Sequence, residues 1–279
     1  MIVYPNAKIN LGLNILRRRP DGYHDIETLM VPVPWRDILE IVPSSGTGTT
    51  LTVSGRAVGC PPEKNLVMKA YRALAETVDI PPVDIYLHKI IPDGAGLGGG
   101  SADAAFTLTC LNGLFALGLD REQLAAIAAG IGADCPFFIY NRPMMATSTG
   151  TVLRPVELSA TPMAIAIAKP RGVAVSTAEA YAGVTPSENS QSLDSIITLP
   201  VGEWQRAGLK NDFETSVFAK ALATAALKRH FIDSGAVYAA MSGSGAAVFG
   251  LFDDIGAARA AAAAVSPDSD ILVDIIKFS

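Results

Sequence analysis

Apolar and polar residues alternate along much of the first ninety residues, a pattern typical of strands that bury one face. Between the fourth and fifth such segments, apolar residues recur at helical spacing from Leu66 to Val78. We therefore expect a helix over residues 64–78 that covers a sheet. The segments predicted to be strands are 7–16, 26–35, 37–42, 50–54 and 83–91.

The rest of the chain combines helical and strand patterns. The residue pattern predicts helices over 101–117, 121–130, 217–231 and 255–265, and strands over 163–168, 237–240, 246–252 and 271–276. Asp120 is a good cap for the second of these helices. Because 279 residues exceed what one core usually holds, we expect an α+β protein of two lobes, 1–158 and 159–279, divided near a Thr161–Pro162 turn. Residues 185–193 are polar and predict a surface loop.

Composition narrows the class of partner. The chain is 49% hydrophobic and 18% charged, as in globular proteins, and its net charge is 22 − 27 = −5 with no dense basic run. Nucleic-acid binding is therefore not expected, and a small-molecule partner is. There is no apolar run of membrane-spanning length and no signal-peptide pattern, so we expect a cytoplasmic protein without a membrane segment. The three cysteines lack the paired spacing of a disulfide framework or a zinc site.

The most informative stretch is PDGAGLGGGSADAA, residues 92–105, with five glycines between Gly94 and Gly100. Glycines let successive N–H groups approach an anion, and a helix predicted to be capped by Ser101 adds unpaired donors, so the stretch predicts a phosphate cradle. The alternative is a glycine-rich turn between a strand and a helix, but an ordinary turn seldom needs five glycines in seven residues. A dinucleotide fingerprint is also present in the G-x-G-x-x-G spacing, but helix follows where that fold needs a strand. A P-loop would require Gly-Lys-Ser/Thr.

Five other motifs occur in an order that resembles the GHMP kinases. They are PNAKINL (5–11), PDGYHDIETL (20–29), GADCPFF (132–138), NDFE (211–214) and MSGSGAAVF (241–249). The resemblance implies a two-lobed GHMP kinase fold, with an N-terminal lobe like ribosomal protein S5 and a ferredoxin-like C-terminal lobe. It also implies ATP-dependent phosphorylation of a small alcohol.

Two residues fall on the catalytic positions of that family. By itself, Lys8 could be a strand-end lysine that reaches water, and Asp134 could cap a turn. The resemblance implies that Lys8 neutralises charge near the γ-phosphate and that Asp134 orients the acceptor hydroxyl and accepts its proton late. Lys8 beside Asp134 would keep that carboxylate ionised. Asn10, on the same strand face, is expected to be a hydrogen-bonding neighbour and to contact substrate.

The resemblance also implies an acceptor and its contacts. The DGYH segment receives a cytidine base, with Tyr23 as a stacking platform, His24 as a hydrogen-bonding partner and Tyr181 on the other side of the ring. The acceptor implied is the tertiary 2-hydroxyl of a cytidine-diphospho-methylerythritol, a precursor in non-mevalonate isoprenoid synthesis. Mevalonate and homoserine are alternative acceptors, although they would need no aromatic platform.

ATP and Mg²⁺ are the cofactors implied. The resemblance places ATP against Pro92, Asp93, Gly94, Ala95, Gly96, Leu97, Gly98, Gly99, Gly100, Ser101 and Ala102, with Asn65 and Lys89 near the adenine. Asn65 could equally be only a helix-start residue. Ser101 is the leading candidate for a Mg²⁺ ligand. Asp103 is a second candidate, or an acid favoured by the helix dipole.

Two further features complete the predicted site. Residues 242–245 form either a simple hairpin-like turn or, as the resemblance implies, part of the wall of the phosphate pocket. Family members often carry a glycine-rich turn that ends in Glu, whereas residues 146–156 here have Thr151 at that position, which weakens any role for this turn. A nucleotide sensor without catalysis is the alternative from another class, and the presence of both Lys8 and Asp134 argues against it. We expect a monomer or a weak homodimer.

Overall fold

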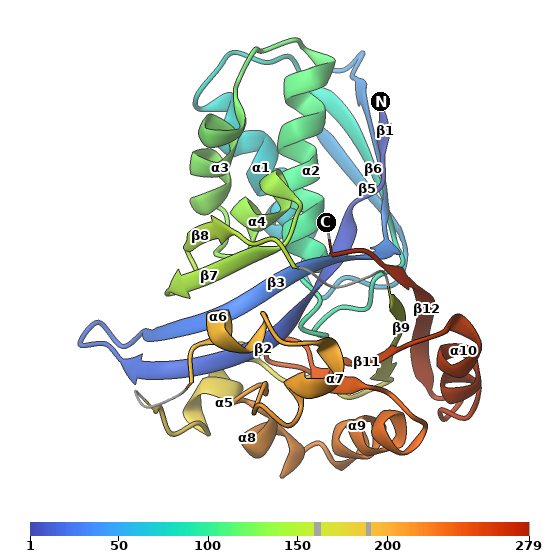
Figure 1. Ribbon diagram of the computed structural model, residues 1–279. Helices are drawn as coiled ribbons and strands as arrows, with labels where there is room; N and C mark the ends of the chain where they lie inside the picture. The colour runs from blue at the N-terminus through green and yellow to red at the C-terminus, as the bar shows by residue number, and fades with distance from the viewer. Residues whose placement is uncertain (159–162, 188–190, 279) are drawn as a thin grey trace. The chain divides into compact units, whose positions relative to one another are not determined.

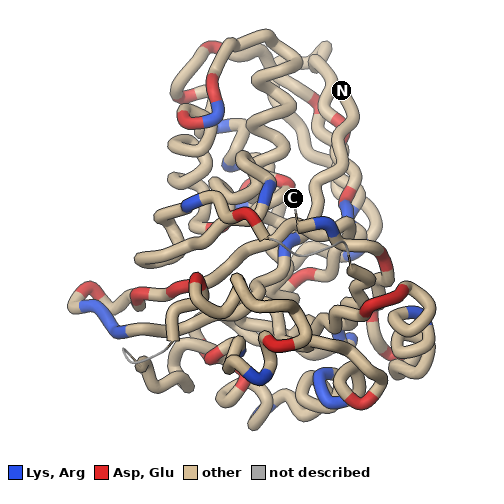
Figure 2. Tube along the Cα trace, in the orientation of Figure 1, with Lys and Arg blue, Asp and Glu red and all other residues tan. Residues whose placement is uncertain are grey.

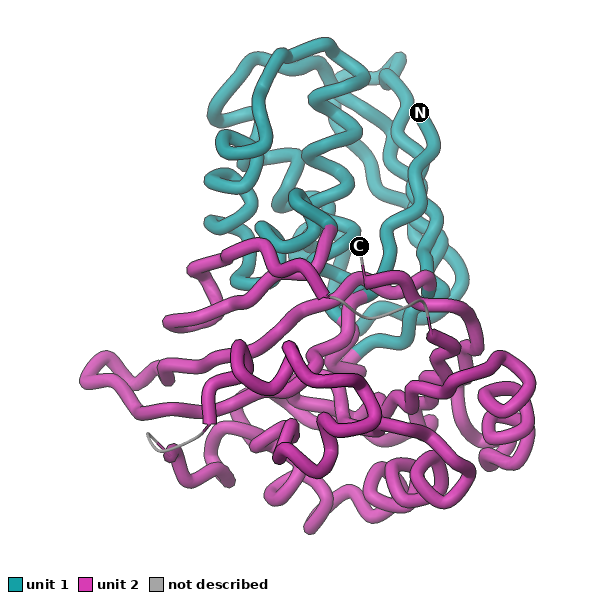
Figure 3. The backbone as a smooth tube through the Cα atoms, in the orientation of Figure 1, with its two compact units in different colours: residues 1–7, 35–93, 98–141 teal, residues 8–34, 94–97, 142–279 magenta. Residues whose placement is uncertain are grey.

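The computed structural model describes residues 1–158, 163–187 and 191–278. The chain divides into two compact units (Figure 3). Unit 1 comprises residues 1–7, 35–93 and 98–141, and unit 2 comprises residues 8–34, 94–97 and 142–279. Helices and strands are mixed in both units (Figure 1), so the predicted α+β class is confirmed. The lobe boundaries at 1–158 and 159–279 stay predictions, and the Thr161–Pro162 turn lies outside the described residues.

Unit 1 consists of one sheet with helices on one face (Figure 1). The strand order is β1-β4-β6-β5, antiparallel except for the β5–β6 pair. Alternate residues of β6 are buried, as its alternating sequence predicts. The strands are β1 Ile2–Val3, β4 Ile38–Pro43, β5 Thr50–Gly55 and β6 Val83–Lys89, and the helices are η1 Pro62–Lys64, α1 Leu66–Ala75, α2 Gly99–Leu114, α3 Arg121–Ala129 and α4 Cys135–Tyr140.

The two remaining sheets belong to unit 2, apart from the first residues of β2 and the last residues of β3. The first has the order β2-β3-β7-β8, with strands β2 Asn6–Arg18, β3 His24–Arg36, β7 Met144–Ser148 and β8 Val152–Pro155. The second has the order β10-β11-β9-β12, with strands β9 Met163–Pro170, β10 Tyr238–Met241, β11 Val248–Phe252 and β12 Ser269–Ile276. Every residue of β9 is buried, and β11 and β12 pair with its two edges.

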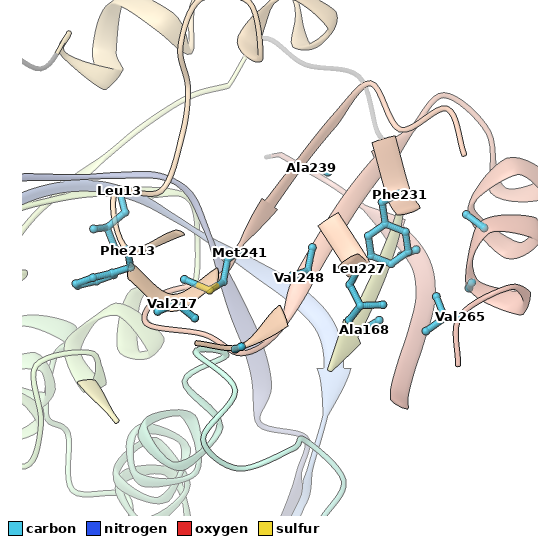
Figure 4. Close-up of a cluster of buried hydrophobic side chains, with 14 of the residues drawn as sticks. Leu13, Ala168, Phe213, Val217, Leu227, Phe231, Ala239, Met241, Val248 and Val265 are labelled. Atoms are coloured by element: carbon cyan, nitrogen blue, oxygen red, sulfur yellow. The ribbon is translucent and has the colours of Figure 1, made fainter. Parts of the chain in front are cut away.

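Six helices among the described residues complete unit 2. They are α5 Thr177–Ala182, α6 Leu193–Ile196, α7 Val201–Trp204, α8 Glu214–Phe218, α9 Leu222–Asp233 and α10 Ile255–Ala263. Side chains from β2, α8, α9 and the β9–β11 strands form a hydrophobic cluster, seen in Figure 4 around Val217, Met241 and Phe231.

The predicted strands and most helices are confirmed, with differences at the ends. The helix predicted over 217–231 is in fact two helices, α8 and α9, because Ala221 has φ −108° and ψ 70°, outside the helical region. Its apolar spacing survives the break because both helices bury residues in the same core. In the predicted loop 185–193, residues 185–187 and 191–192 are irregular and α6 begins at Leu193, while 188–190 lie outside the described residues.

Charges of both signs are interspersed along the described chain (Figure 2). In the described ranges, no helix combines the length and the apolar character that crossing a membrane requires.

Candidate active site

The glycine loop adopts a backbone that side chains would disfavour. Gly94, Gly96 and Gly98 have φ values of 57°, 73° and 71°, in the left-handed region. Helix α2 begins at Gly99, so the prediction that Ser101 is its N-cap is wrong: Gly98 holds that position and Ser101 lies half-buried in the first turn. Because Gly99 and Gly100 have taken helical conformation, the first helical N–H groups come from the glycine run itself. These groups have no partner within the helix and can receive an anion.

The tip of this loop, residues 94–97, is held by backbone hydrogen bonds within unit 2. The amide of Lys8 donates to the carbonyl of Leu97 at 2.9 Å, and the amide of Ala247 donates to the carbonyl of Ala95 at 3.0 Å. The tip is therefore fixed to β2 and to the loop that precedes β11.

The base of the loop is held within unit 1 by a buried lysine and two carboxylates. Lys89 Nζ donates to Asp103 Oδ2 at 2.7 Å and also to Asp37 Oδ2. Asp37 Oδ1 accepts from the amides of Ile90 and Ile91 at 2.5 and 2.8 Å. A Cβ on Gly99 would lie 3.0 Å from Ile91 Cγ2, closer than side chains normally approach, so the glycine permits close packing of α2 against the end of β6. The end of β6 and the start of α2 are thereby joined.

Burial and neighbouring charges together shift the pKa values of Asp103 and Lys89. Burial raises the pKa of Asp103 to about 7, against the opposing charge of Lys89. Burial alone would lower the pKa of Lys89, but the charges of Asp103 and Asp37 outweigh it and the net shift is upward. Lys89 is therefore a charged group hydrogen-bonded to both Asp103 and Asp37, and its contact with adenine stays a prediction.

Lys8 is buried, with 3% of its surface exposed, so the alternative that it reaches water is wrong. Its Nζ donates to Asn10 Oδ1 at 2.6 Å, which confirms Asn10 as its hydrogen-bonding neighbour. Asn10 donates in turn to Thr28 Oγ1 at 2.9 Å, and Thr28 donates to the Gly12 carbonyl at 2.7 Å. Every side chain in this chain of bonds is buried, which restricts the ammonium to one position.

Asp134 is half-buried and precedes α4, but its side chain makes no capping hydrogen bond to that helix. The turn-capping alternative therefore gains no support. Lys8 belongs to unit 2 and Asp134 to unit 1, and their pairing stays a prediction. The adjacent Cys135 is buried, and burial raises the pKa of its thiol to about 11, although a hydrogen bond with Ser101 partly opposes the shift. A thiol of that pKa is not a nucleophile at neutral pH.

Aromatic side chains from distant segments meet in unit 2. The ring of His24 stacks on that of Tyr181, with centroids 4.7 Å apart and planes 19° from parallel, and Phe213 contacts Tyr181 edge-on at 4.8 Å. Tyr23 is 67% exposed. Sequence reasoning did not single out Phe213, because nothing in the NDFE motif indicates that its phenylalanine contacts Tyr181. Partial burial, and then the charge of Arg18, lower the pKa of His24, so the imidazole is neutral at neutral pH and can both donate and accept.

Two other predicted features have local roles. Asn65 caps α1, since its Oδ1 accepts from the Val67 amide at 3.0 Å, and its contact with adenine stays a prediction. The turn around Thr151 connects β7 and β8 as a hairpin, with Gly150 at φ 88° and a 3.2 Å contact between the Thr149 and Thr151 hydroxyls.

Known proteins resemble this chain over nearly its whole length. Residues 65–142 match the GHMP kinases N terminal domain and residues 200–268 match the GHMP kinases C terminal domain. A 4-diphosphocytidyl-2-C-methyl-D-erythritol kinase from Parabacteroides distasonis is 54% identical over 91% of this chain and 92% of its own. The protein of that name from Bacteroides fragilis is 50% identical over 90% and 92%.

Solved structures of kinases also resemble this chain over nearly its whole length. A crystal structure of 4-(cytidine 5'-diphospho)-2C-methyl-D-erythritol kinase superposes with a TM-score of 0.83 at 32% identity and covers 99% of both chains. A homoserine kinase from Cytophaga hutchinsonii superposes with a TM-score of 0.72 at 19% identity, over 97% of this chain and 94% of its own, which shows the shared fold alone.

Proposed function

Because this chain belongs to the GHMP kinase family, we propose that it transfers the γ-phosphoryl group of ATP to the 2-hydroxyl of 4-diphosphocytidyl-2-C-methyl-D-erythritol, giving the 2-phosphate and ADP. The observation that carries the proposal is the 54% identity, over 91% of the chain, with a relative of that name. The reaction is a step of non-mevalonate isoprenoid precursor synthesis. The proposal includes a cytoplasmic enzyme that is a monomer or a weak homodimer.

Binding of the ATP phosphates is assigned to the glycine loop. The left-handed glycines and the N-terminus of α2 offer backbone N–H groups and a favourable helix dipole, which suits a polyanion. The two sets of contacts that hold the tip and the base of this loop keep those donors in place before ATP arrives. Preorganised donors stabilise transferred charge better than donors that must reorient.

The chemical step is assigned to Lys8 and Asp134. Phosphoryl transfer passes through a loose transition state, so positioning and charge stabilisation matter more than early removal of a proton. The buried ammonium of Lys8, held by Asn10, would act on the transferring group from a fixed position. Asp134 would orient the acceptor hydroxyl and take its proton as the bond to phosphorus forms, while ADP leaves.

Magnesium is the second cofactor in the proposal. The described residues include no group of three or more His, Cys, Asp or Glu side chains that could hold a metal. Mg²⁺ in kinases keeps several waters and binds mainly phosphate oxygens, so a single hard oxygen ligand is compatible with it. Ser101 offers such a hydroxyl in the first turn of α2, whereas Asp103 is hydrogen-bonded by Lys89. The ion would offset charge on the β- and γ-phosphates.

The aromatic group of unit 2 supports a cytidine-bearing acceptor. A base can stack on aromatic rings, and a neutral His24 can pair with its polar edge. Mevalonate and homoserine carry no ring that would use these side chains. The aromatic group therefore favours the nucleotide-bearing alcohol.

An ADP-release assay with Mg·ATP and each of the three alcohols tests the proposal. We expect turnover with 4-diphosphocytidyl-2-C-methyl-D-erythritol alone. Turnover with mevalonate or homoserine would keep the kinase and remove the cytidine assignment of Tyr23 and His24. If none of the three is phosphorylated although ATP binds, the nucleotide-sensor alternative is favoured.

A further inference from the structure

The NDFE motif lies outside the glycine loop, yet the side chains of Asn211 and Glu214 bind residues 241–247, which comprise the last residue of β10 and a second glycine-containing loop. Asn211 is buried, with 2% of its surface exposed, and its Nδ2 donates to the carbonyls of Met241 and Gly243, each at 2.8 Å. Its Oδ1 accepts from the Phe213 amide at 3.0 Å. Glu214 accepts from the Met241 amide at 2.8 Å and from Lys228 Nζ at 2.6 Å.

The second loop in turn contacts the tip of the first. Ser242 Oγ donates to the Gly96 carbonyl at 2.9 Å. A Cβ on Gly96 would lie 1.9 Å from the Ser242 carbonyl oxygen, so no side chain fits between the two backbones. Small displacements of the second loop must therefore move the tip, because packing this close leaves no slack.

The NDFE segment is also attached to β2, the strand that carries Lys8. The Leu13 amide donates to the Lys210 carbonyl at 2.8 Å, and the Asp212 amide donates to the Leu13 carbonyl at 2.9 Å. The Lys8 amide bonds the opposite end of the loop tip at Leu97. These contacts form a closed circuit within unit 2: β2, the NDFE segment, the second loop, and the tip of the glycine loop.

From this circuit we infer that Asn211 is a positioning residue for nucleotide binding: its two amide hydrogens fix the second glycine loop, and that loop sets the backbone donors of residues 94–97. The inference deepens the proposed function and rests on the glycine loop being the ATP site. Only a side chain with two donors on one nitrogen can bind both carbonyls, and only one with an adjacent acceptor can also hold the Phe213 amide.

The variant Asn211→Asp separates these two functions. It keeps the oxygen that accepts from Phe213, and hence the support of the Tyr181 ring, but replaces the two donors with an oxygen that faces two carbonyls. We expect the Kd and KM for Mg·ATP to rise about tenfold or more, because two buried hydrogen bonds are lost, while the KM for the cytidine acceptor stays within about twofold.

The control is Leu227→Ala, which removes buried atoms from the hydrophobic cluster of unit 2 and leaves every hydrogen bond described above for the two loops in place. Each variant is assayed at the same interval below its own Tm, so that the two are compared at equal thermal stability. We expect Leu227→Ala to leave the KM for Mg·ATP and the KM for the cytidine acceptor near their wild-type values. If Asn211→Asp raises the two KM values equally, or if Leu227→Ala reproduces the ATP effect, Asn211 is merely structural and the inference is overturned.

A double-mutant cycle with Ser242→Ala provides a test that does not depend on Asn211→Asp alone. If Asn211 acts through the second loop, the effects of Asn211→Ala and Ser242→Ala on ATP affinity should be less than additive, because both weaken one contact chain. Additive effects would overturn the inference. A wild-type protein that bound ATP but failed to phosphorylate the cytidine acceptor would contradict the proposed substrate and leave this test of nucleotide affinity intact.

Discussion

At the scale of single residues, Asp134 and Lys8 carry the predicted chemistry. Asp134→Asn keeps the shape of the side chain but cannot accept a proton. We expect kcat to fall by about 10² to 10⁴, the range typical of a lost general base, with ATP affinity changed little. Single-turnover kinetics and calorimetry with an ATP analogue would measure the two quantities. Turnover near the wild-type rate would mean that another group takes the proton.

A second residue-scale expectation concerns pH and the buried Asp103. Because burial raises its pKa in the folded state from 3.8 to about 7, the folded protein binds more protons than the unfolded chain between these values. The stabilisation from protonated Asp103 is thus fully present below about pH 4 and lost as pH rises to about 7. In Asp103→Asn this contribution is absent. We expect the Tm of the variant, relative to wild type, to rise from pH 4 to pH 7.

A difference in Tm that does not vary with pH would show that Asp103 does not titrate there. The charged groups that face it in the described chain are Lys89 and Asp37. Because the charge of Asp37 helps to raise the pKa of Asp103, Asp37→Asn should weaken the pH dependence that Asp103 gives to the Tm. Removing Lys89 should be worse than either change, because two carboxylates would then share a buried site without a cation.

At the scale of elements, α3 shows how local sequence sets a boundary. Asp120 Oδ1 accepts from the Gln123 amide at 2.8 Å, and Gln123 Oε1 accepts from the Asp120 amide at 2.9 Å, a reciprocal capping box. We expect Asp120→Ala to lower the free energy of unfolding by about 1 kcal/mol, measured by denaturant titration, with turnover unchanged. A loss of activity would mean that α3 contributes to the site, contrary to our assignment.

At the scale of the whole molecule, ligands that bind only the folded chain must raise its Tm. We expect cytidine diphosphate and ADP each to do so, with uridine diphosphate weaker than cytidine diphosphate because its base edge differs. Tyr181→Ala should abolish the shift with cytidine diphosphate and retain the shift with ADP, since Tyr181 stacks on His24 and lies apart in sequence from the glycine loop. Equal loss of both shifts would contradict separate sites.

Features that depend on neighbours along the chain could be predicted from residue order. Strand β6 follows from its alternating pattern, β9 from a short apolar run, and helix α3 from its cap, all of which are local properties. The glycine run predicted a phosphate cradle because glycines let successive N–H groups approach an anion, and Gly94, Gly96 and Gly98 do have left-handed backbone. The predicted start of α2 is two residues too late because Gly99 and Gly100 are poor helix formers, whereas the helix begins at Gly99.

Tertiary structure alone decided which of these segments meet. Nothing in the separate motifs indicates that Tyr181 stacks on His24, that Lys89 is bound by Asp37, or that Asn211 holds the loop at Met241 and Gly243. Each of these contacts joins residues far apart in sequence, and its energy depends on burial that the whole core provides. Residue types therefore revealed the chemistry, whereas packing determined how its parts are held.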